Sequence, residues 1–293
     1  MTGKIIKGIA GFYYVHTENA GVFECKAKGI FRNRRETPLV GDDVKLEILD
    51  EEKKLASIVE LLPRRSRLIR PAVANVDQAV VVFAARNPEP NENLLNRFLI
   101  LMTRQNIPVI IAFNKADLIS EEEKRELEDG WRNTGYEIRF LSAKEHQGTE
   151  EFAKLLEKKT TVLAGPSGVG KSTLVNLFQN HVIMETGAVS EKIKRGKHTT
   201  RHSEFIWINE ETYILDTPGF SSLALDEIAA EELKEYFPEF EGYEGQCRFR
   251  GCMHDNEPEC RVKLAVKEGN ISRRRYEEYR LLYRELKTVK KYK

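Results

Sequence analysis

The sequence predicts a multidomain α/β protein with an N-terminal antiparallel β-barrel, a central doubly wound parallel sheet and a helical C-terminal domain. Three observations predict this. Short runs rich in Ile, Val and Phe, separated by turn residues, fill the first 62 positions of the 293-residue chain. From Asn75 onward, continuous apolar runs alternate with segments of helical periodicity, and after about Leu225 helical patterns dominate. We place the domain boundaries at 1–68, 69–225 and 226–293.

The N-terminal runs predict a small barrel. They cover residues 4–9, 21–27, 43–49 and 55–61. A five-strand OB barrel fits this length, and that fold is a frequent oligonucleotide-binding module. A different small barrel with no role in nucleic-acid binding fits the same pattern and stays an alternative. The basic, proline-bounded stretch 63–71 that follows is typical of a linker.

The central region alternates strands with helices. Residues 79–84 (AVVVFA) and 109–113 are continuous apolar runs, as expected for strands buried on both faces. Residues 91–105 have helical periodicity with Asn91 as N-cap, and a capping box opens the next helix at Ser120. Further strands are expected at 138–141, 161–164, 205–208 and 213–215. This alternation predicts a mostly parallel sheet with helices on both faces.

The C-terminal region is helical, and its end is basic. Residues 226–237 form an amphipathic helical pattern, and 271–293 predict a long helix that carries Tyr276, Tyr279 and Tyr283. The last 21 residues of the chain hold nine Lys or Arg against three Asp or Glu. The net charge of the whole chain is only +1, so composition does not indicate a nucleic-acid partner. A solvated helix explains the basic run as well as a polyanion-binding helix does.

Nothing in the sequence favours a membrane protein. No stretch approaches the ~18 apolar residues of a membrane span. The start lacks the long apolar run and the small-residue cleavage site of a secretory signal. We therefore expect a cytoplasmic protein with no membrane partner. We also expect a monomer, although nothing in the sequence determines the oligomeric state.

A phosphate-binding loop lies between a predicted strand and a predicted helix. Residues 165–172, GPSGVGKS, match G-x-x-x-x-G-K-[ST]. The glycines let successive backbone N–H groups point at phosphate oxygens, and the helix N-terminus adds its dipole. Lys171 should reach the β and γ phosphates and assist catalysis, and Ser172 should supply its hydroxyl to Mg²⁺. The expected phosphate-binding residues are Gly165, Pro166, Ser167, Gly168, Val169, Gly170, Lys171, Ser172 and Thr173.

A guanine-selecting motif, N-K-x-D, follows the buried strand at 109–113. It is Asn114-Lys115-Ala116-Asp117. The Asp117 carboxylate can accept two hydrogen bonds, from guanine N1–H and from the exocyclic amine, and adenine offers neither donor in that geometry. Lys115 would pack its stem along the ring, and Asn114 would brace the loop. The motif therefore predicts a preference for GTP and GDP.

A second base-recognition element, S-A-K, follows the next strand. Ser142-Ala143-Lys144 would place a backbone N–H against guanine O6. The tripeptide is common by chance. Its position at the end of the strand after N-K-x-D is what gives it weight.

Two further motifs fit the segments that sense the γ-phosphate. At 216–219, DTPG, Asp216 would hold Mg²⁺ through water and the Gly219 N–H would touch the γ-phosphate, although a simple strand-to-turn D-x-P-G is the alternative. At 196–201, GKHTTR, we expect Thr200 to contact Mg²⁺ and the γ-phosphate, and Thr199 remains open.

The order of these motifs is unusual. GTPases generally carry the phosphate loop first, then the two switches, then the base motifs. Here the base motifs at 114 and 142 precede the phosphate loop at 165. A parallel sheet tolerates such a rearrangement if the original chain ends lie close together. The sequence therefore predicts a circularly permuted G domain.

A predicted metal site follows the motif at 216–219. Cys247, Cys252, His254 and Cys260 offer three thiolates and one imidazole within 14 residues. This is a complete tetrahedral set, typical of a closed structural zinc site. Cys25 stands apart and is best explained as a core residue of the barrel.

Together, the permuted order, the barrel and the Cys-x4-Cys-x-His-x5-Cys cluster resemble the bacterial ribosome small subunit-dependent GTPase A family over essentially the whole chain. The resemblance implies an OB domain, a permuted GTPase domain and a zinc domain. It also implies binding to the small (30S) ribosomal subunit and its rRNA, GTP hydrolysis stimulated by that subunit, and a role late in its maturation.

The resemblance also bears on catalysis. Many GTPases place a Gln just after D-x-x-G to orient water, and here that position is Phe220. In related enzymes the His of G-[KR]-H-T-T is the proposed substitute, and His198 matches it. Two alternatives stay open: His198 only packs or binds rRNA, or the ribosome supplies the group.

Two other functions are compatible with parts of the sequence. A phosphate loop alone also fits an ATPase or a kinase. A non-catalytic RNA-binding or assembly scaffold that merely holds nucleotide is the second alternative.

Overall fold

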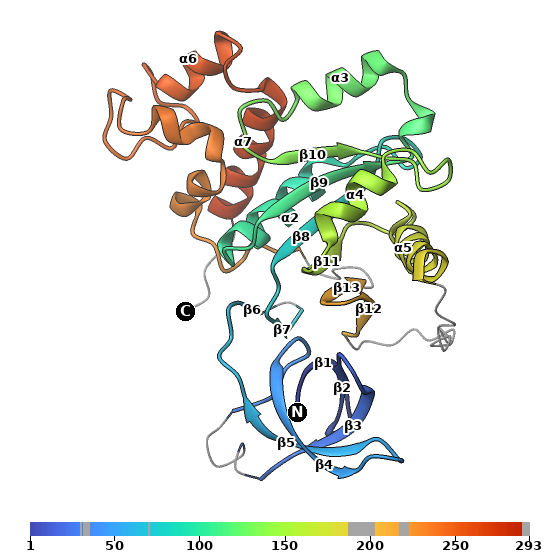
Figure 1. Ribbon diagram of the computed structural model, residues 1–293. Helices are drawn as coiled ribbons and strands as arrows, with labels where there is room; N and C mark the ends of the chain where they lie inside the picture. The colour runs from blue at the N-terminus through green and yellow to red at the C-terminus, as the bar shows by residue number, and fades with distance from the viewer. Residues whose placement is uncertain (30, 32–35, 70, 187–202, 217–222, 289–293) are drawn as a thin grey trace. The chain divides into compact units, whose positions relative to one another are not determined.

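The computed structural model describes residues 1–29, 31, 36–69, 71–186, 203–216 and 223–288 (Figure 1). The chain forms two compact units, each assembled from separate stretches of sequence. The first comprises residues 1–80, 146–164 and 170–219, and the second comprises 81–145, 165–169 and 220–293.

The N-terminal strands form the expected closed barrel, in the order β1-β2-β3-β5-β4 (Figure 1). The strands are β1 (Thr2–Ile9), β2 (Phe12–Thr17), β3 (Gly21–Ala27), β4 (Asp43–Asp50) and β5 (Leu55–Leu61). The barrel is not wholly antiparallel as expected, because the strands β3 and β5 that close it pair in parallel. The sequence pattern does not predict β2, which a tight turn joins to β1. Ala10 and Gly11 of that turn have φ values of 52° and 84°, and Ala-Gly lacks the usual Asn-Gly signature of such a hairpin.

Alternate residues of the barrel strands fill its interior. Ile5, Val15, Phe23 and Ile58 are 0% exposed. Cys25 belongs to the same cluster at 1% exposure, and burial raises the pKa of its thiol to about 12. Its placement in the barrel core is therefore confirmed.

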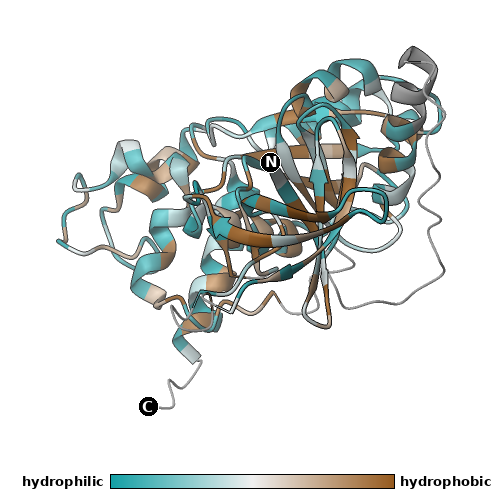
Figure 2. Cartoon of the chain, turned by 60° about the horizontal axis from the view of Figure 1, so that its bottom comes forward, coloured by the Kyte–Doolittle hydropathy of each residue, from teal (hydrophilic) through white to brown (hydrophobic). Residues whose placement is uncertain are grey.

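The central region forms a six-stranded sheet, in the order β10-β9-β8-β11-β13-β12. Its strands are β8 (Gln78–Ala84), β9 (Val109–Asn114), β10 (Glu137–Phe140), β11 (Thr160–Ala164), β12 (Phe205–Asn209) and β13 (Thr212–Asp216). The β9/β10 and β11/β13 pairs are parallel, and β12 lies antiparallel to β13 at the edge. Every residue of β8 and β11 is buried, as the continuous apolar runs predict. Figure 2 shows the chain coloured by hydropathy, with brown hydrophobic segments along strands of the structure.

Two helix starts expected from capping signals are confirmed. Helix α2 (Glu92–Arg104) begins after Asn91, whose side chain accepts a 2.9 Å bond from the Leu94 N–H. Helix α3 (Glu121–Asp129) begins with the reciprocal bonds of a capping box between Ser120 and Glu123. The sheet region also contains α4 (Thr149–Leu156) and α5 (Lys171–Thr186). Within the expected linker, β6 (Arg67–Leu68) pairs with β7 (Val73–Ala74).

The expectation of an α-helix over 226–237 is wrong. The segment instead contains a 3₁₀ stretch, η2 (Ala230–Tyr236), and a second one, η3 (Pro238–Tyr243), follows directly. Pro238 lacks an N–H and disfavours helical backbone at the residue before it, so an α-helix cannot run through this point. Farther on lie α6 (Arg261–Lys267) and α7 (Arg273–Thr288). Helix α7 matches the long C-terminal helix expected from residue 271, and residues 289–293 lie outside the described part.

Arg275 of α7 forms a buried ion pair within the C-terminal region and also contacts α2. Arg275 of α7 is 3% exposed and donates to the Glu239 carboxylate through Nε at 2.7 Å and through a second nitrogen at 3.1 Å. It also donates to the Asn96 side chain of α2 and lies 4.4 Å over the ring of Phe237. Removing one partner of such a pair leaves an uncompensated buried charge, which costs roughly 3–5 kcal/mol.

In the part of the chain that the structure describes, no helix combines the length and apolar character that crossing a membrane requires.

Candidate nucleotide and metal sites

The phosphate loop takes the backbone conformations that its glycines predict. Gly165, Gly168 and Gly170 have φ values of 137°, 81° and 96°, which L side chains rarely adopt. A Cβ atom added at Gly165 would lie 2.1 Å from the carbonyl oxygen of Val82 in β8. The loop follows β11, and α5 begins at Lys171. Lys171 and the two residues after it, Ser172 and Thr173, therefore form the first turn of a 16-residue helix, where backbone N–H groups and the helix dipole favour phosphate.

The Asn114 side chain joins three loops. It is 2% exposed at the end of β9. Its Nδ2 donates to the carbonyl oxygen of Val169 in the phosphate loop at 2.9 Å, and its Oδ1 accepts from the Ala143 N–H at 3.0 Å. One buried amide thereby connects the N-K-x-D loop, the S-A-K loop and the phosphate loop.

Lys115 adds a second bridge to the phosphate loop. Its backbone is left-handed, with φ 61°, a conformation that a non-glycine residue holds only at some cost. Its Nζ donates to the Gly168 carbonyl at 2.8 Å and also to the carbonyl of Asn87. The turn at Lys115 starts the short 3₁₀ segment η1 (Ala116–Leu118) that carries Asp117.

Asp117 and the S-A-K loop carry the polar groups that are expected to recognise the guanine base. Asp117 is exposed, and among the described residues no hydrogen bond or ion pair engages its carboxylate. Ser142 is fully buried, and its hydroxyl accepts the Glu145 N–H at 3.1 Å, which closes the loop around Ala143 and Lys144. The Ala143 N–H already donates to Asn114, so the expected bond to guanine O6 requires either exchange of that contact or another N–H of the loop.

Asp216 lies at the carboxyl end of β13. In the parallel register of β11 and β13 it is the partner of Leu163, two residues before the phosphate loop begins. Asp216 therefore emerges beside the base of that loop, where a carboxylate can serve a metal ion bound to phosphates. His198, Thr199, Thr200, Gly219 and Phe220 lie outside the described residues.

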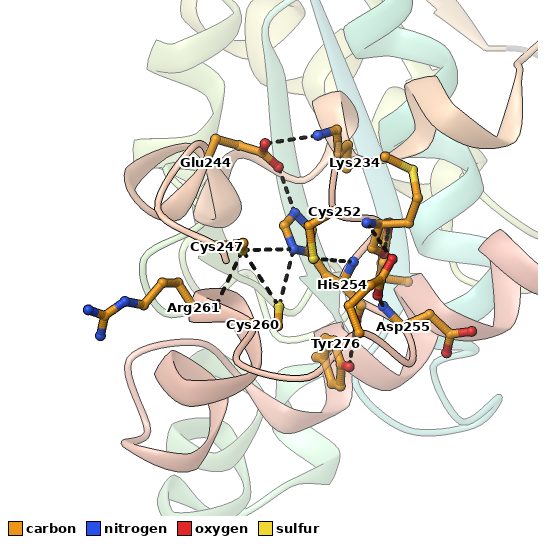
Figure 3. Close-up of polar contacts among 12 residues, drawn as sticks. Lys234, Glu244, Cys247, Cys252, His254, Asp255, Cys260, Arg261 and Tyr276 are labelled. Atoms are coloured by element: carbon orange, nitrogen blue, oxygen red, sulfur yellow. Dashed lines mark hydrogen bonds and ion pairs between the residues drawn. The ribbon is translucent and has the colours of Figure 1, made fainter. Parts of the chain in front are cut away.

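The four expected metal ligands converge (Figure 3). The ligand atoms of Cys247, Cys252, His254 and Cys260 all lie within 4.8 Å of one another. The Cys247 and Cys260 sulfurs are 3.9 Å apart, and His254 Nδ1 lies 3.7 Å and 3.3 Å from them. Tetrahedral zinc with bonds of about 2.3 Å to sulfur requires ligand separations of roughly 3.8 Å. The cluster therefore fits a four-coordinate metal ion.

His254 is oriented by a carboxylate on its other nitrogen. Its Nε2–H donates to Glu244 Oε1 at 2.7 Å, and Lys234 donates to the same carboxylate at 2.9 Å (Figure 3). This contact leaves the Nδ1 lone pair facing the cysteines, as metal-binding histidines require. Burial raises the pKa of the Cys252 thiol to about 12, so binding a cation there displaces a proton. Sequence reasoning missed Glu244, because no spacing rule marks a carboxylate that acts through a ligand.

The tyrosines of α7 support the metal-binding loop. Tyr276 donates to the His254 carbonyl at 2.6 Å, and Tyr279 donates to the Met253 carbonyl at 2.7 Å. Arg280 and Arg284 both donate to Asp255 Oδ1, at 2.8 Å and 3.0 Å. Several tyrosine and arginine side chains of this basic helix therefore contact the loop that carries the cluster.

Comparison with known proteins decides the family. A model of the RsgA GTPase family matches residues 61–226, and a model of the RsgA N-terminal domain matches residues 2–56. The chain belongs to the RsgA GTPase family. The small ribosomal subunit biogenesis GTPase RsgA of Agathobacter rectalis is 53% identical, with 100% of each chain covered. Its counterpart from Alkaliphilus metalliredigens is 49% identical, with 99% of each chain covered.

Solved structures agree with this RsgA assignment. The circularly permuted GTPase YloQ matches with a TM-score of 0.78 and 38% identity, over 100% of this chain and 96% of that one. YjeQ from Thermotoga maritima matches with a TM-score of 0.81 and 34% identity, over 99% of each chain. The expected permuted fold is confirmed, and this RsgA family member is a GTP-hydrolysing enzyme.

Gly165→Ala should weaken nucleotide binding. The added methyl group would collide with the Val82 carbonyl, and φ 137° strains any L residue, so the loop must shift. We expect the affinity for a fluorescent GDP analogue, measured by titration, to fall about tenfold or more. Gly242→Ala is the control, because a Cβ there meets nothing within 4 Å. Equal affinities in the two variants would contradict the expected role of this loop.

Proposed function

We propose that this GTPase couples GTP hydrolysis to late maturation of the small (30S) ribosomal subunit, binds that subunit through its rRNA, and is stimulated by it. The observation that carries the proposal is the full-length similarity to relatives named for small-subunit biogenesis. The closed barrel adds support, because barrels of this size are frequent oligonucleotide-binding modules. Under this proposal residues 1–68, 69–225 and 226–293 act as the RNA-binding, GTPase and metal-binding parts of a cytoplasmic monomer.

Guanine selection rests on Asp117 and the loops beside it. The exposed Asp117 carboxylate would accept from guanine N1–H and from the exocyclic amine. Lys115, fixed against the Gly168 carbonyl at 2.8 Å, would cover the ring with its stem. The S-A-K loop, anchored by Asn114, would supply an N–H to guanine O6. An adenine base would leave the Asp117 carboxylate unpaired, which is a strong ground for rejection.

The phosphate end of the site rests on α5 and β13. Lys171 would neutralise the β and γ phosphates, and Ser172, Asp216 and Thr200 would hold Mg²⁺. When bound, Mg²⁺ neutralises charge that develops on the phosphate oxygens during transfer. The Gly219 N–H would contact the γ-phosphate. We propose His198 as the residue that orients the attacking water, since Phe220 cannot hydrogen-bond to it.

The metal ion of the Cys₃His cluster is proposed to be zinc. Three sulfurs and one imidazole form a soft, closed set that suits tetrahedral Zn²⁺. With four protein ligands the site offers no position for substrate, so its role would be structural.

Contacts to rRNA are assigned to the barrel and to α7. Of the basic residues on α7, Arg275, Arg280 and Arg284 are engaged by carboxylates within the protein. Arg273 and Lys287 are exposed and remain the better candidates for phosphate contacts.

Asp117→Asn should exchange guanine for xanthine selectivity. The amide replaces an acceptor with a donor, which no longer matches guanine N1–H and suits the xanthine carbonyl instead. We expect GTP affinity to fall roughly 10- to 100-fold and XTP affinity to rise, as measured by competition against a fluorescent nucleotide. Asp129→Asn, the same change at an exposed helix residue, should alter neither. An ATPase or kinase would show no such exchange.

Small subunits should accelerate turnover. We expect purified small subunits to raise the GTP hydrolysis rate about tenfold or more, and large subunits to leave it unchanged, in single-turnover phosphate-release assays. A scaffold that only holds nucleotide predicts no turnover in either case. Equal stimulation by both subunits would contradict a specific small-subunit role.

Cys252→Ser should release the metal ion. A serine hydroxyl is a poor substitute for a thiolate ligand, and a three-ligand site binds zinc far more weakly. Mass spectrometry of the purified protein should find about one zinc ion per chain in the wild type and much less in the variant. Cys25→Ala, at the buried barrel cysteine, should keep its zinc. A different metal in the wild type would refute the zinc assignment.

A further inference from the structure

The end of barrel strand β2 contacts both strands of the β12–β13 hairpin through one side chain. Trp207 and Tyr213 are direct cross-strand partners on that hairpin. His16 is 5% exposed, and its Nδ1 forms a 2.8 Å hydrogen bond with Tyr213 Oη. Its ring centroid also lies 4.6 Å from that of Trp207. The imidazole is thus held between an indole and a phenol of neighbouring strands.

A chain of polar side chains, buried at Lys4 and Asn75, supports this contact from the barrel side. Lys4 is 8% exposed, and its Nζ lies 5.6 Å over the Tyr213 ring and 2.7 Å from Asp43 Oδ1. Asn75 donates to the other oxygen of Asp43 at 3.1 Å. Burial raises the pKa of Tyr213 and lowers the pKa of His16, so their hydrogen bond joins two neutral groups near neutral pH.

A backbone contact continues the junction at the start of the hairpin. Lys7 of β1 forms an antiparallel bridge with Glu204, directly before β12. Their side chains form an ion pair at 2.8 Å. The barrel therefore holds the hairpin at its beginning and on its aromatic pair.

The hairpin occupies a special place in the chain. It covers residues 205–216 and connects the motif at 196–201 to the motif at 216–219, the two segments assigned by sequence to sensing the γ-phosphate. The hairpin ends at Asp216, the first residue of the second motif, so the position of the hairpin bears directly on that residue. Coupling that acts on the rate of hydrolysis need not be reciprocal, so it can be lost without a change in subunit affinity.

We propose that His16 and Tyr213 are positioning residues through which RNA bound to the barrel promotes GTP hydrolysis. They touch neither the nucleotide-binding motifs nor the metal cluster among the described residues, and they act through the β12–β13 hairpin. This inference rests on the proposed function, which supplies the rRNA of the small subunit as the occupant of the barrel.

The first test separates binding from stimulation. Tyr213→Phe removes the hydroxyl and keeps the ring. We expect its basal turnover to equal that of the wild type and its affinity for small subunits, with a non-hydrolysable GTP analogue, to be unchanged. Stimulation by saturating small subunits should fall at least about fivefold, the low end of typical allosteric coupling. The double variant His16→Phe/Tyr213→Phe should show the same loss and no more.

Tyr14→Phe is the matched control. It removes a barrel hydroxyl that donates to Glu24 at 3.2 Å within the β2/β3 pair and makes no contact with the hairpin. Its stimulation should match that of the wild type. Full stimulation of Tyr213→Phe, or an equal loss in Tyr14→Phe, would overturn the proposal. So would a loss of subunit affinity in Tyr213→Phe, because it would make the hydroxyl part of the binding surface.

A second test needs no ribosomal subunit. The chain has two tryptophans, so Trp131→Phe leaves Trp207 beside His16 as the only indole. Trp207 emission should differ between the GDP and GTP-analogue complexes, and Tyr213→Phe should reduce that difference to less than about half. Identical emission with both nucleotides would disprove the coupling. If small subunits fail to stimulate the wild type, the proposed function has failed, and this fluorescence result still decides the present inference.

Discussion

The buried side chain of Asn114 is the interaction that holds together the three loops of the proposed nucleotide site. It satisfies a carbonyl in the phosphate loop and an N–H in the S-A-K loop, at 2.9 Å and 3.0 Å, while sitting in the N-K-x-D loop itself. Leaving either partner unpaired in a buried place would cost about 1–3 kcal/mol. Because these are contacts in space, they do not depend on the order in which the chain visits the three loops. That independence is why the permutation leaves the site intact.

The permutation changes what is connected to the site. The motif at 216–219 is followed by the 3₁₀ segments and the metal cluster, and not by the base-recognition loops. Those C-terminal elements are fixed to helix α2, because Arg275 of α7 contacts Glu239 and also Asn96 of α2 in a buried network. This ion pair makes the C-terminal region a firm attachment for the chain that follows residue 219, and a metal ion bound at the proposed site would strengthen it further.

Much of this could be predicted from the sequence, for identifiable reasons. Some features are encoded by neighbouring residues alone, and the folded structure keeps them. These are the N-cap at Asn91, the capping box at Ser120 and the apolar runs of β8 and β9. The metal ligands converge because their short spacing leaves them little freedom. Glu244, the Arg275 pair and the His16–Tyr213 contact join residues that no local pattern relates. The helix expected over 226–237 failed because Pro238 and tertiary packing outweighed its amphipathic pattern.

Two buried contacts, Arg275–Glu239 and His16–Tyr213, differ in strength, and the difference suits them to different roles. Arg275 and Glu239 form a bidentate charged pair whose rupture costs several kcal/mol, which suits a permanent attachment. The His16–Tyr213 bond joins two neutral groups, and such bonds contribute only about 1 kcal/mol net. Allosteric coupling energies are of that size, about 1–3 kcal/mol. The Lys7–Glu204 bridge and ion pair also hold the hairpin to the barrel, so under the proposed coupling the weaker His16–Tyr213 bond can bias the hairpin between two arrangements without being its main attachment. The contact between the barrel and the hairpin that lies between the two motifs proposed to sense the γ-phosphate thus has the strength that the proposed coupling requires.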